Sequence, residues 1–501
     1  MIFRDWLKEL DYTLLQGSVD VETEDVIYDS RKAAPGKVFV AMKGIRVDGH
    51  SFIPQVLKAG VRVLVTERPV EEELKNSGLS EEELKQVTVV MVEEGRHALA
   101  LLSAARFDHP AKKLVMIGVT GTKGKTTTTH MIRAILLAAG KKVGMIGTTG
   151  TVIGDVVTPT LNTTPESYEL HQAFAQMVEA GCEYAVMEVS SQGIKMHRTD
   201  GLYFNYAIFT NISPDHIGPG EHADFEEYLY YKTRLLNMCG IGLVNKDDKH
   251  APQIIKAANC ELCTYSEESK EADFVASDIR YVSQPDFVGT EFHISGKYDM
   301  EVRLGIPGLF NVVNALAAVS VCSFLGLDQA RISHALENIR VNGRMEIVYT
   351  SERCTVLVDY AHNAVSMESL LSTLRDYKPK RLVCVFGCGG NRSKDRRYSM
   401  GEIGGKMADL SIITADNSRY EKVEDIIADI RGSIEKTGGK FIEIPDRREA
   451  IRYSILHAQP GDMVAVIGKG HEDYQEINGV RHHFLDREVI EETVKELGEK
   501  A

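Results

Sequence analysis

A loop rich in glycine and threonine, residues 118–129, constrains this chain more than any other feature of its sequence. An apolar run precedes the loop, and residues 131–139 continue with helical periodicity as far as Gly140. In such a turn, backbone N–H groups and the positive end of the helix dipole converge on one point, where Lys125 and the Thr126 hydroxyl add a charge and a Mg²⁺ ligand. Five residues rather than four separate Gly118 from Gly124. We therefore predict a shorter variant of the phosphate-binding loop that binds a nucleoside triphosphate.

Composition limits the classes of protein to which the chain can belong. With 501 residues it is too long for a single core, and about three domains are expected. A net charge of −14 argues against a broad nucleic-acid surface but is compatible with a local basic pocket for a phosphorylated ligand. No run approaches the roughly 20 apolar residues that span a bilayer, and the first residues lack the apolar core of a signal peptide. We expect a cytoplasmic monomer without a nucleic-acid or membrane partner.

The eight cysteines are scattered along the chain, and only Cys260 and Cys263 have the spacing of a metal-binding or redox pair. No second pair and no histidine lie nearby in the sequence, so we predict reduced thiols on a strand rather than a zinc site.

Alternating strands and helices predict an α/β protein of three units. Residues 1–92 hold short strands and an acidic helical stretch at 70–85, residues 93–341 surround the phosphate loop, and residues 342–501 form a further α/β unit. In the second unit Thr164 is expected to cap a helix that begins at Pro165. An antiparallel insert is expected between about residue 270 and Gly308.

Polar residues follow the predicted strands of the second unit, where a parallel sheet gathers its ligands. Glu188 and His216 lie at such strand ends, and together with Thr126 they suit a Mg²⁺ ion beside a triphosphate. Imidazole is an unusual Mg²⁺ ligand, so a hydrogen-bonded turn residue is the alternative for His216. Lys232, on a helix that Asp224 can cap, is either a solvated lysine or one that points into a cleft, and the sequence leaves both open.

Three loops of the third unit also follow predicted strands. They comprise residues 387–397, 416–419 and 468–472, and they combine glycines that allow close approach with arginines, carboxylates and an amide. Arginine forks bind carboxylates and acidic side chains bind ammonium groups, so the three loops together suit a zwitterionic ligand such as an amino acid.

Many short motifs occur in order along the chain. They are Tyr28-Asp-Ser-Arg31, Gly44 with Asp48-Gly49, the phosphate loop, Asn162-Thr-Thr-Pro165, Glu188-Val-Ser-Ser191, His197-Arg198, Asn211 with Asp215-His216, Asn311 with Asn314, Gly343-Arg-Met-Glu346, Asp359-Tyr-Ala-His362, Gly387-Cys-Gly-Gly390 and Gly468-Lys-Gly-His-Glu472. On these motifs the chain resembles the Mur ligase family, ATP-dependent amide-bond enzymes of bacterial cell-wall synthesis, over nearly its whole length. It looks most like the MurE type, which adds the third residue of the peptide stem to UDP-N-acetylmuramoyl-L-alanyl-D-glutamate.

The resemblance implies a three-domain architecture, with a central P-loop mononucleotide-binding parallel sheet and a Rossmann-like C-terminal domain. The first domain would bind the UDP end of the substrate, the second ATP with Mg²⁺, and the third the incoming amino acid. Catalytic roles would fall to Lys125, Glu188, His216 and Lys232. The Mg²⁺ site would use Thr126, Glu188, His216 and Lys232, the last as N6-carboxylysine, because a carbamate supplies anionic oxygen ligands.

The resemblance also assigns binding residues. ATP would be bound by Gly121, Thr122, Lys123, Gly124, Lys125, Thr126, Thr127, Asn311, Arg344 and Asp359. The UDP-linked substrate would be bound by Ser30, Asn162, Thr163, Thr164, Ser191 and Arg198. The amino acid would be bound by Arg397, Asp416, Asn417, Arg419, Gly468 and Glu472.

The implied reaction transfers the γ-phosphoryl group to the D-glutamyl carboxylate, and the amine then attacks the acyl phosphate. Arg419 favours meso-diaminopimelate as the amine, because diaminopimelate-adding relatives carry an arginine there that holds the second carboxylate. Ser418 replaces their proline, which removes a fixed φ from this loop. Met196 and the stretch Ile45-Arg46-Val47 also depart from relatives.

Several alternatives stay open at this point. One is a paralogue that adds L-lysine or another amine, and a second is an enzyme similar to folylpolyglutamate synthase, against which Asp29-Ser-Arg31 argues. A third is a P-loop switch that hydrolyses ATP without forming a bond.

Overall fold

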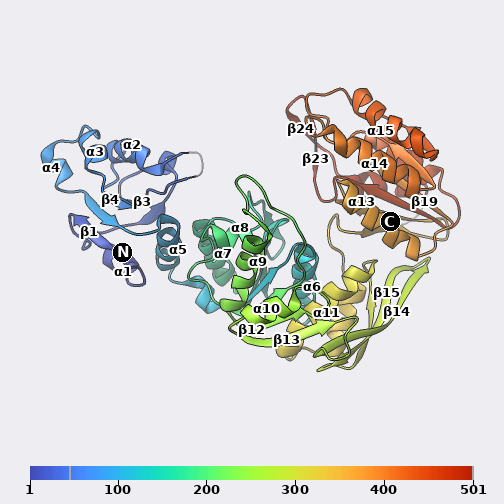
Figure 1. Ribbon diagram of the computed structural model, residues 1–501, viewed down its shortest axis with the longest axis horizontal. Coiled ribbons are helices and arrows are strands. Elements are labelled where there is room, and N and C mark those ends of the chain that lie inside the picture. The colour runs from blue at the N-terminus through green and yellow to red at the C-terminus, as the bar shows by residue number, and fades with distance from the viewer. Residues whose placement is uncertain (45–46, 499–501) are drawn as a thin grey trace. The chain divides into compact units, whose positions relative to one another are not determined.

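The computed structural model describes residues 1–44 and 47–498 (Figure 1). These residues form two compact units that divide after Tyr265. The departure at Ile45-Arg46 lies outside the described residues. The division falls inside the predicted second domain, and the domain boundaries at 92/93 and 341/342 stay predictions. None of the helices in the described part of the chain is long and apolar enough to cross a bilayer.

The N-terminal part of the first unit is a five-stranded sheet between two apolar layers. The strands follow the order β1 (Thr13–Gln16), β5 (Thr88–Met91), β4 (Val63–Thr66), β3 (Lys37–Val40) and β2 (Asp25–Ile27). Its helices are α1 (Phe3–Trp6), α2 (Ile53–Lys58), α3 (Glu71–Lys75) and α4 (Glu81–Leu84), with 3₁₀ turns at Ser30–Lys32 and Gly49–Phe52. The stretch predicted as one helix is therefore two, because Gly78 has a φ of 73° and Ser80 starts a new helix through a capping box with Glu83.

The rest of the first unit is built on a second sheet. Its strands follow the order β13 (Glu261–Ser266), β12 (Cys239–Asn245), β11 (Phe204–Phe209), β6 (Val115–Thr120), β10 (Tyr184–Glu188), β7 (Val143–Gly147), β8 (Gly150–Ile153) and β9 (Val156–Thr158). The strands from β13 to β7 are parallel, as the βαβ pattern predicts, whereas β8 and β9 are antiparallel. Helices and 3₁₀ turns connect them: α5 (Gly95–Arg106), η3 (Pro110–Lys113), α6 (Lys125–Ala138), α7 (Ser167–Glu179), α8 (Ser191–Lys195), α9 (Phe225–Thr233), η4 (Arg234–Asn237) and α10 (Ala251–Ala257).

The predicted cap at Thr164 is wrong. Helix α7 begins at Ser167, after Glu166. The Thr164 side chain is fully buried instead, where its hydroxyl donates to the Glu188 carbonyl at 3.0 Å and accepts from the Ser190 N–H at 2.9 Å. The backbone at the end of β10 needs these partners, and a local Thr-Pro pattern does not reveal them.

The predicted cysteine pair lies only partly on a strand. Cys263 is buried on β13, whereas Cys260 is half-buried and precedes that strand, and none of the eight cysteines, all of which lie in the described part of the chain, forms a disulfide. The Cys260 thiol lies close to that of Cys239, on the neighbouring strand.

The second unit begins with the predicted antiparallel insert, a meander of β14 (Phe274–Gln284), β15 (Phe287–Gly296) and β16 (Met300–Leu304). Helices α11 (Leu309–Phe324) and α12 (Gln329–Glu337) follow. The six-stranded sheet beyond them has the order β17 (Glu346–Thr350), β18 (Cys354–Asp359), β22 (Asp462–Ile467), β19 (Arg381–Phe386), β20 (Leu410–Ile413) and β21 (Phe441–Glu443). Its other elements are α13 (Ala364–Asp376), α14 (Lys394–Met407), α15 (Val423–Thr437), α16 (Arg447–Leu456), α17 (Asp486–Glu496) and the hairpin of β23 (Tyr474–Ile477) and β24 (Val480–His483).

This six-stranded sheet is parallel from β18 to β21, and only β17 is antiparallel. Of the strands in this sheet, β22 comes last along the chain, yet it lies between β18 and β19. The strand order therefore reverses there. Ligands of open α/β sheets gather at the carboxyl ends of strands beside such a reversal. The three polar loops that were predicted within residues 342–501 all begin at this edge.

Candidate active site

The phosphate loop connects β6 to α6 and is held by the end of β11. Gly121 has a φ of 145°, and a Cβ there would lie 1.9 Å from the Thr210 Oγ1, so only glycine fits. The Lys123 N–H donates to the Asn211 Oδ1 at 2.9 Å, and the Asn211 Nδ2 donates back to the Lys123 carbonyl at 3.0 Å. Gly124, with a φ of 86°, precedes the first residue of α6. The loop therefore has the strand, glycine and helix context that a phosphate cradle requires.

Two lysines donate to one carbonyl of this loop. Lys125 Nζ lies 2.8 Å from the Gly121 oxygen, and Lys232 Nζ lies 2.9 Å from the same atom. Lys232 is only 2% exposed and lies over the Tyr228 ring at 4.6 Å. Burial, followed by the nearby charge of Lys125, lowers the pKa of Lys232 well below its usual value. Of the two alternatives open from the sequence, the structure selects the lysine that points inward.

Glu188, at the end of β10, gathers hydroxyl and amide donors beside the phosphate loop. Its Oε1 accepts from Thr126 Oγ1 at 3.0 Å and from the Thr148 N–H at 2.9 Å. Its Oε2 lies 3.3 Å from the Thr148 hydroxyl. Glu188 is buried, and a Cβ on Gly147 would lie 2.4 Å from its carboxylate. Thr148 was missed in the sequence, because nothing in the local pattern marks the turn after β7.

His216 lies in a turn with a φ of 53°, and its side chain is 57% exposed. Its Nδ1 lies 3.2 Å from the Glu221 Oε1, and its ring centroid lies 6.1 Å from that of Tyr228. Tyr228 in turn contacts the Thr122 hydroxyl at 3.1 Å. The Tyr228 side chain thus lies between the His216 imidazole and the phosphate loop, and the imidazole is open to solvent.

Several residues predicted to bind the UDP-linked substrate surround the start of α7 and α8. Arg198 donates to the Thr164 carbonyl and, through Nε at 3.0 Å, to Glu166. The hydroxyl of Thr163 contacts that of Thr148 at 3.2 Å, and Asn162 is exposed. Ser191 Oγ lies 2.9 Å from Nε2 of His222, a fully buried histidine that the sequence did not single out. Ser30 lies apart from these residues in sequence, in a 3₁₀ turn that the Asp29 side chain caps.

A methyl group at Gly121 is expected to destabilise the protein and to abolish nucleotide binding. Gly121→Ala combines an unfavourable φ with an overlap against Thr210, whereas Gly154→Ala changes a glycine at φ 60° with no atom within 4 Å of the added carbon. The Gly154 variant should lose about 1 kcal/mol and the Gly121 variant several-fold more. Thermal unfolding and ADP binding of both variants check this, and equal effects would contradict it.

In the second unit, three predicted nucleotide residues lie near the start of α11 and the end of β18. Asn311 is buried and donates to the Pro307 carbonyl at 2.7 Å. Asp359 accepts from the Met345 and Ala361 N–H groups, both at 2.8 Å, while burial raises the pKa of its carboxyl. The Arg344 guanidinium lies 4.8 Å from the centre of the Tyr360 ring.

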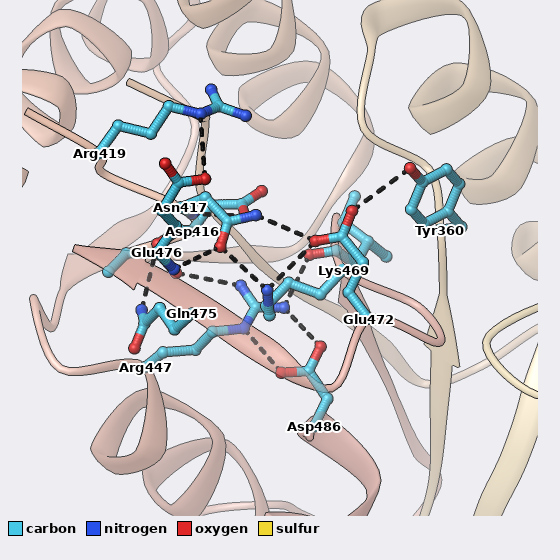
Figure 2. Close-up of polar contacts among 12 residues, drawn as sticks. Tyr360, Asp416, Asn417, Arg419, Arg447, Lys469, Glu472, Gln475, Glu476 and Asp486 are labelled. Carbon is cyan, nitrogen blue, oxygen red and sulfur yellow. Dashed lines mark hydrogen bonds and ion pairs between the residues drawn. The ribbon is translucent and has the colours of Figure 1, made fainter. Parts of the chain in front are cut away.

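Four of the residues predicted to bind the amino acid belong to one polar cluster, drawn in Figure 2: Asp416, Asn417, Arg419 and Glu472. Asn417 is its centre: Nδ2 donates to the Glu472 Oε2 at 3.0 Å, and Oδ1 accepts from the Glu476 N–H at 2.9 Å and from Lys469 Nζ at 3.3 Å. Lys469 is fully buried and also contacts Glu472 at 3.3 Å. Gly468 has a φ of 112°, and a Cβ added to it would lie 3.0 Å from the Asp416 carboxylate. The loop after β22 therefore passes close to Asp416.

Arg419 is fixed by the β23–β24 hairpin rather than by a proline. Its φ of 52° is left-handed, its N–H donates to the Glu476 carbonyl at 2.9 Å, and its carbonyl accepts from the Asn478 N–H at 2.5 Å. The guanidinium donates to the Gly390 carbonyl at 2.7 Å and lies 3.6 Å from the Glu476 carboxylate. These contacts replace the constraint that Ser418 removes.

Arg397 is buried and already paired in this structure. It donates to both carboxylate oxygens of Glu421 at 2.8 Å and to Asp429 at 2.9 Å. Glu421 also accepts from the Asn391 N–H. Arg397 therefore joins the first turn of α14 to Glu421, which also holds the turn at Asn391.

Arg447 is a residue that the sequence did not reveal. It forms a two-pronged pair with Asp486, both contacts at 2.7 Å, and it donates to the carbonyls of Ala415 at 3.2 Å and Ile467 at 3.0 Å. Both side chains of the pair are fully buried. The guanidinium thus joins the ends of β20 and β22, from which the loops of Asp416 and Gly468 begin.

Removal of Asp486 is expected to be costly for stability. Asp486→Ala would leave the Arg447 guanidinium buried and uncompensated, which typically costs about 3–5 kcal/mol. Glu492→Ala breaks a surface pair with Arg448 and should cost less than about 1 kcal/mol. Urea unfolding followed by circular dichroism compares the two variants, and equal losses would contradict a structural role for the buried pair.

The chain matches known proteins over nearly its whole length. Residues 23–107 match the Mur ligase family catalytic domain, residues 119–322 the Mur ligase middle domain, and residues 343–470 the Mur ligase glutamate ligase domain. It is 39% identical to the UDP-N-acetylmuramoyl-L-alanyl-D-glutamate--2,6-diaminopimelate ligase of Caldanaerobacter subterraneus subsp. tengcongensis and 37% identical to that of Clostridium perfringens, each over 98% of this chain and 98–99% of the relative. A solved structure of a ligase with the same name covers 95% of this chain and 96% of its own, with 30% identity and a TM-score of 0.72.

The chain therefore belongs to the Mur ligase family, with its three-domain α/β fold, and is an ATP-dependent acid–amino-acid ligase. Within the family it is of the MurE type, whose work is peptidoglycan synthesis.

Proposed function

We propose that this ligase joins meso-2,6-diaminopimelate to the D-glutamyl carboxylate of UDP-N-acetylmuramoyl-L-alanyl-D-glutamate. The observation that carries the acceptor is the presence of both charges in one cluster: the Arg419 guanidinium, which lies 3.6 Å from the Glu476 carboxylate, and the carboxylates of Glu472 and Asp416. Diaminopimelate has two carboxylates and two ammonium groups, so it matches both charges, whereas lysine lacks the second carboxylate. The relatives with 37–39% identity carry the name of a diaminopimelate ligase, which supports this acceptor.

The phosphate loop and Glu188 fit a Mg²⁺–nucleotide complex. Mg²⁺ prefers oxygen ligands, and the Thr126 hydroxyl and the Glu188 carboxylate already lie 3.0 Å apart beside the loop. His216 and Lys232, as a carbamate, would complete the protein side of this site. When bound, the ion would neutralise charge on the transferring phosphoryl group.

Lys232 has the properties that carbamylation requires. Only a neutral amine attacks carbon dioxide, and burial favours the neutral form of this side chain. The amine would add to carbon dioxide and release one proton, and the resulting carbamate would present two oxygens that share one negative charge from α9 toward the phosphate loop.

The residues of the chain have distinct tasks in the proposed reaction. Lys125 would bind the transferring phosphoryl oxygens, and the loop N–H groups would offset the charge that gathers there. The muramoyl-dipeptide would be held by Thr164, Arg198, Ser191, Asn162 and Thr163, so that its carboxylate meets the γ-phosphate. The carboxylate becomes an acyl phosphate, and the acceptor amine displaces phosphate to form the amide.

The remaining binding roles complete the proposal. Ser30 would contact the uridine nucleotide, while Asn311, Arg344 and Asp359 would surround the adenine nucleotide. Domains at 1–92, 93–341 and 342–501 would bind the UDP end, ATP and the amino acid in turn. We also propose that the ligase acts as a cytoplasmic monomer.

A phosphate-release assay with the UDP-linked dipeptide, ATP, Mg²⁺ and a panel of amines tests the proposal. We expect stoichiometric phosphate only when both cosubstrates are present, with diaminopimelate preferred over L-lysine. A preference for lysine would refute the acceptor, and phosphate release that needs neither cosubstrate would indicate a switch rather than a ligase.

A further inference from the structure

Two imidazoles and one carboxylate converge on a point of the first unit outside the clusters described above. His97 lies in the first turn of α5, His197 follows α8, and Asp200 comes three residues later. Nδ1 of His97 lies 2.6 Å from the Asp200 Oδ2, and Nδ1 of His197 lies 2.8 Å from the same oxygen. All three ligand atoms lie within 4.8 Å of one another. The two rings meet edge to face, at 77°, and therefore do not stack on each other.

We propose that His97, His197 and Asp200 form a binding site for a divalent transition metal ion, with Zn²⁺ as the best match. Imidazole nitrogen and carboxylate oxygen are the ligands that Zn²⁺ and Co²⁺ accept, whereas Mg²⁺ selects oxygen ligands. The donor set thus separates this site chemically from the Mg²⁺ site proposed beside the phosphate loop. Three protein ligands leave a fourth tetrahedral position for water.

The observed distances need only small adjustments to admit the ion. Zinc–ligand bonds of about 2.0–2.2 Å place tetrahedral ligand atoms about 3.3 Å apart, so each N···O distance would widen by about 0.6 Å. The side chains of His97 and His197 are 44% and 39% exposed, so packing does not prevent rotation of their rings, and the ion can enter from solvent. The turn that carries two of the ligands is anchored by Thr199 and Leu202, which are buried.

The electrostatic surroundings of the cluster are suited to a cation. The Asp200 carboxylate, which accepts from both imidazoles, contributes one negative charge to the cluster. Glu94, which caps α5, adds a second negative charge close enough to act on His197, and Arg234 adds a positive charge that opposes it.

A bound ion would join α5 to the 197–200 turn. Both segments carry an arginine that holds Glu166: Arg96 at 3.3 Å and Arg198 through Nε at 3.0 Å. The ion would therefore brace the segment from which Arg198 extends, and metal binding should raise the thermal unfolding temperature.

Metal titration of the full-length protein tests the proposal. The protein is stripped with a chelator, kept in excess Mg²⁺ to occupy oxygen-ligand sites, and titrated with Co²⁺ and then Zn²⁺. We expect a visible Co²⁺ absorption band that saturates at one equivalent, its loss on addition of Zn²⁺, and a higher unfolding temperature with Zn²⁺. His97→Ala and Asp200→Asn should each weaken binding by at least about tenfold.

His334→Ala, which removes an exposed histidine of α12, is the matched control and should leave the titration unchanged. The proposal is overturned if no one-equivalent binding occurs, if the His97 and Asp200 variants bind as the unmodified protein does, or if the control weakens binding equally.

Discussion

Replacement of Lys232 by methionine is expected to lower the ligase turnover number on the order of a thousandfold, while the fold stays intact. Methionine fills a similar volume but cannot form a carbamate or donate to the Gly121 carbonyl. Lys256→Met, at an exposed position of α10, is the matched control and should retain full activity. Phosphate release under saturating substrates measures the loss, and substantial activity in the Lys232 variant would refute a role for the carbamate.

The same variant should be at least as stable as the unmodified protein when carbon dioxide is excluded. Because the folded-state pKa of Lys232 lies below the unfolded value of about 10.4, the unfolded chain binds this proton more tightly and the lysine destabilises the fold at neutral pH. The stability gained on substitution should be complete below the folded-state pKa and should fade as the pH rises toward about 10.4. Urea unfolding at pH 7 and pH 10 checks this, and a gain that grows with pH would contradict it.

Replacement of Arg419 by alanine is expected to lower kcat/KM for diaminopimelate by about 100-fold, since a charge-assisted hydrogen bond to the second carboxylate is lost. The KM for ATP should not change, and any use of L-lysine should fall much less. Arg419→Lys should recover part of the loss, because it keeps the charge without the planar fork.

Arg431→Ala on α15 removes an arginine paired with Glu443 and serves as the control, with no expected change in either substrate. Equal losses for ATP and diaminopimelate in Arg419→Ala would show that Arg419 is structural.

Much of the fold could be predicted because its signals are local and repeated. Apolar runs gave β19 with its true ends, and the βαβ order gave the parallel sheets. The errors arose where a distant partner decided the outcome. Thr164 matched a helix cap, but its hydroxyl is bound by the backbone of β10, and a continuous acidic pattern did not show where Gly78 breaks the helix.

The candidate site was predictable in its position but not in its contacts. Strand ends indicated where Glu188 and Asp416 would lie, since parallel strands end at one edge. Which way Lys232 points depends on the packing of α9 against the phosphate loop, and no helical periodicity reveals it. Arg397 looked available for a ligand, whereas the acids that pair with it, Glu421 and Asp429, lie more than twenty residues away. The roles of these residues stay predictions.

The shared carbonyl of Gly121 has a consequence for how modification and nucleotide binding influence each other. While both amines are protonated, Lys125 and Lys232 repel across that oxygen, which is part of what lowers the pKa of Lys232. Carbamylation would reverse the sign of this interaction, so that the α9 side chain attracts Lys125 instead of opposing it. The modified enzyme would then hold its phosphate-binding ammonium in place before ATP arrives, and less ordering would remain to oppose nucleotide binding.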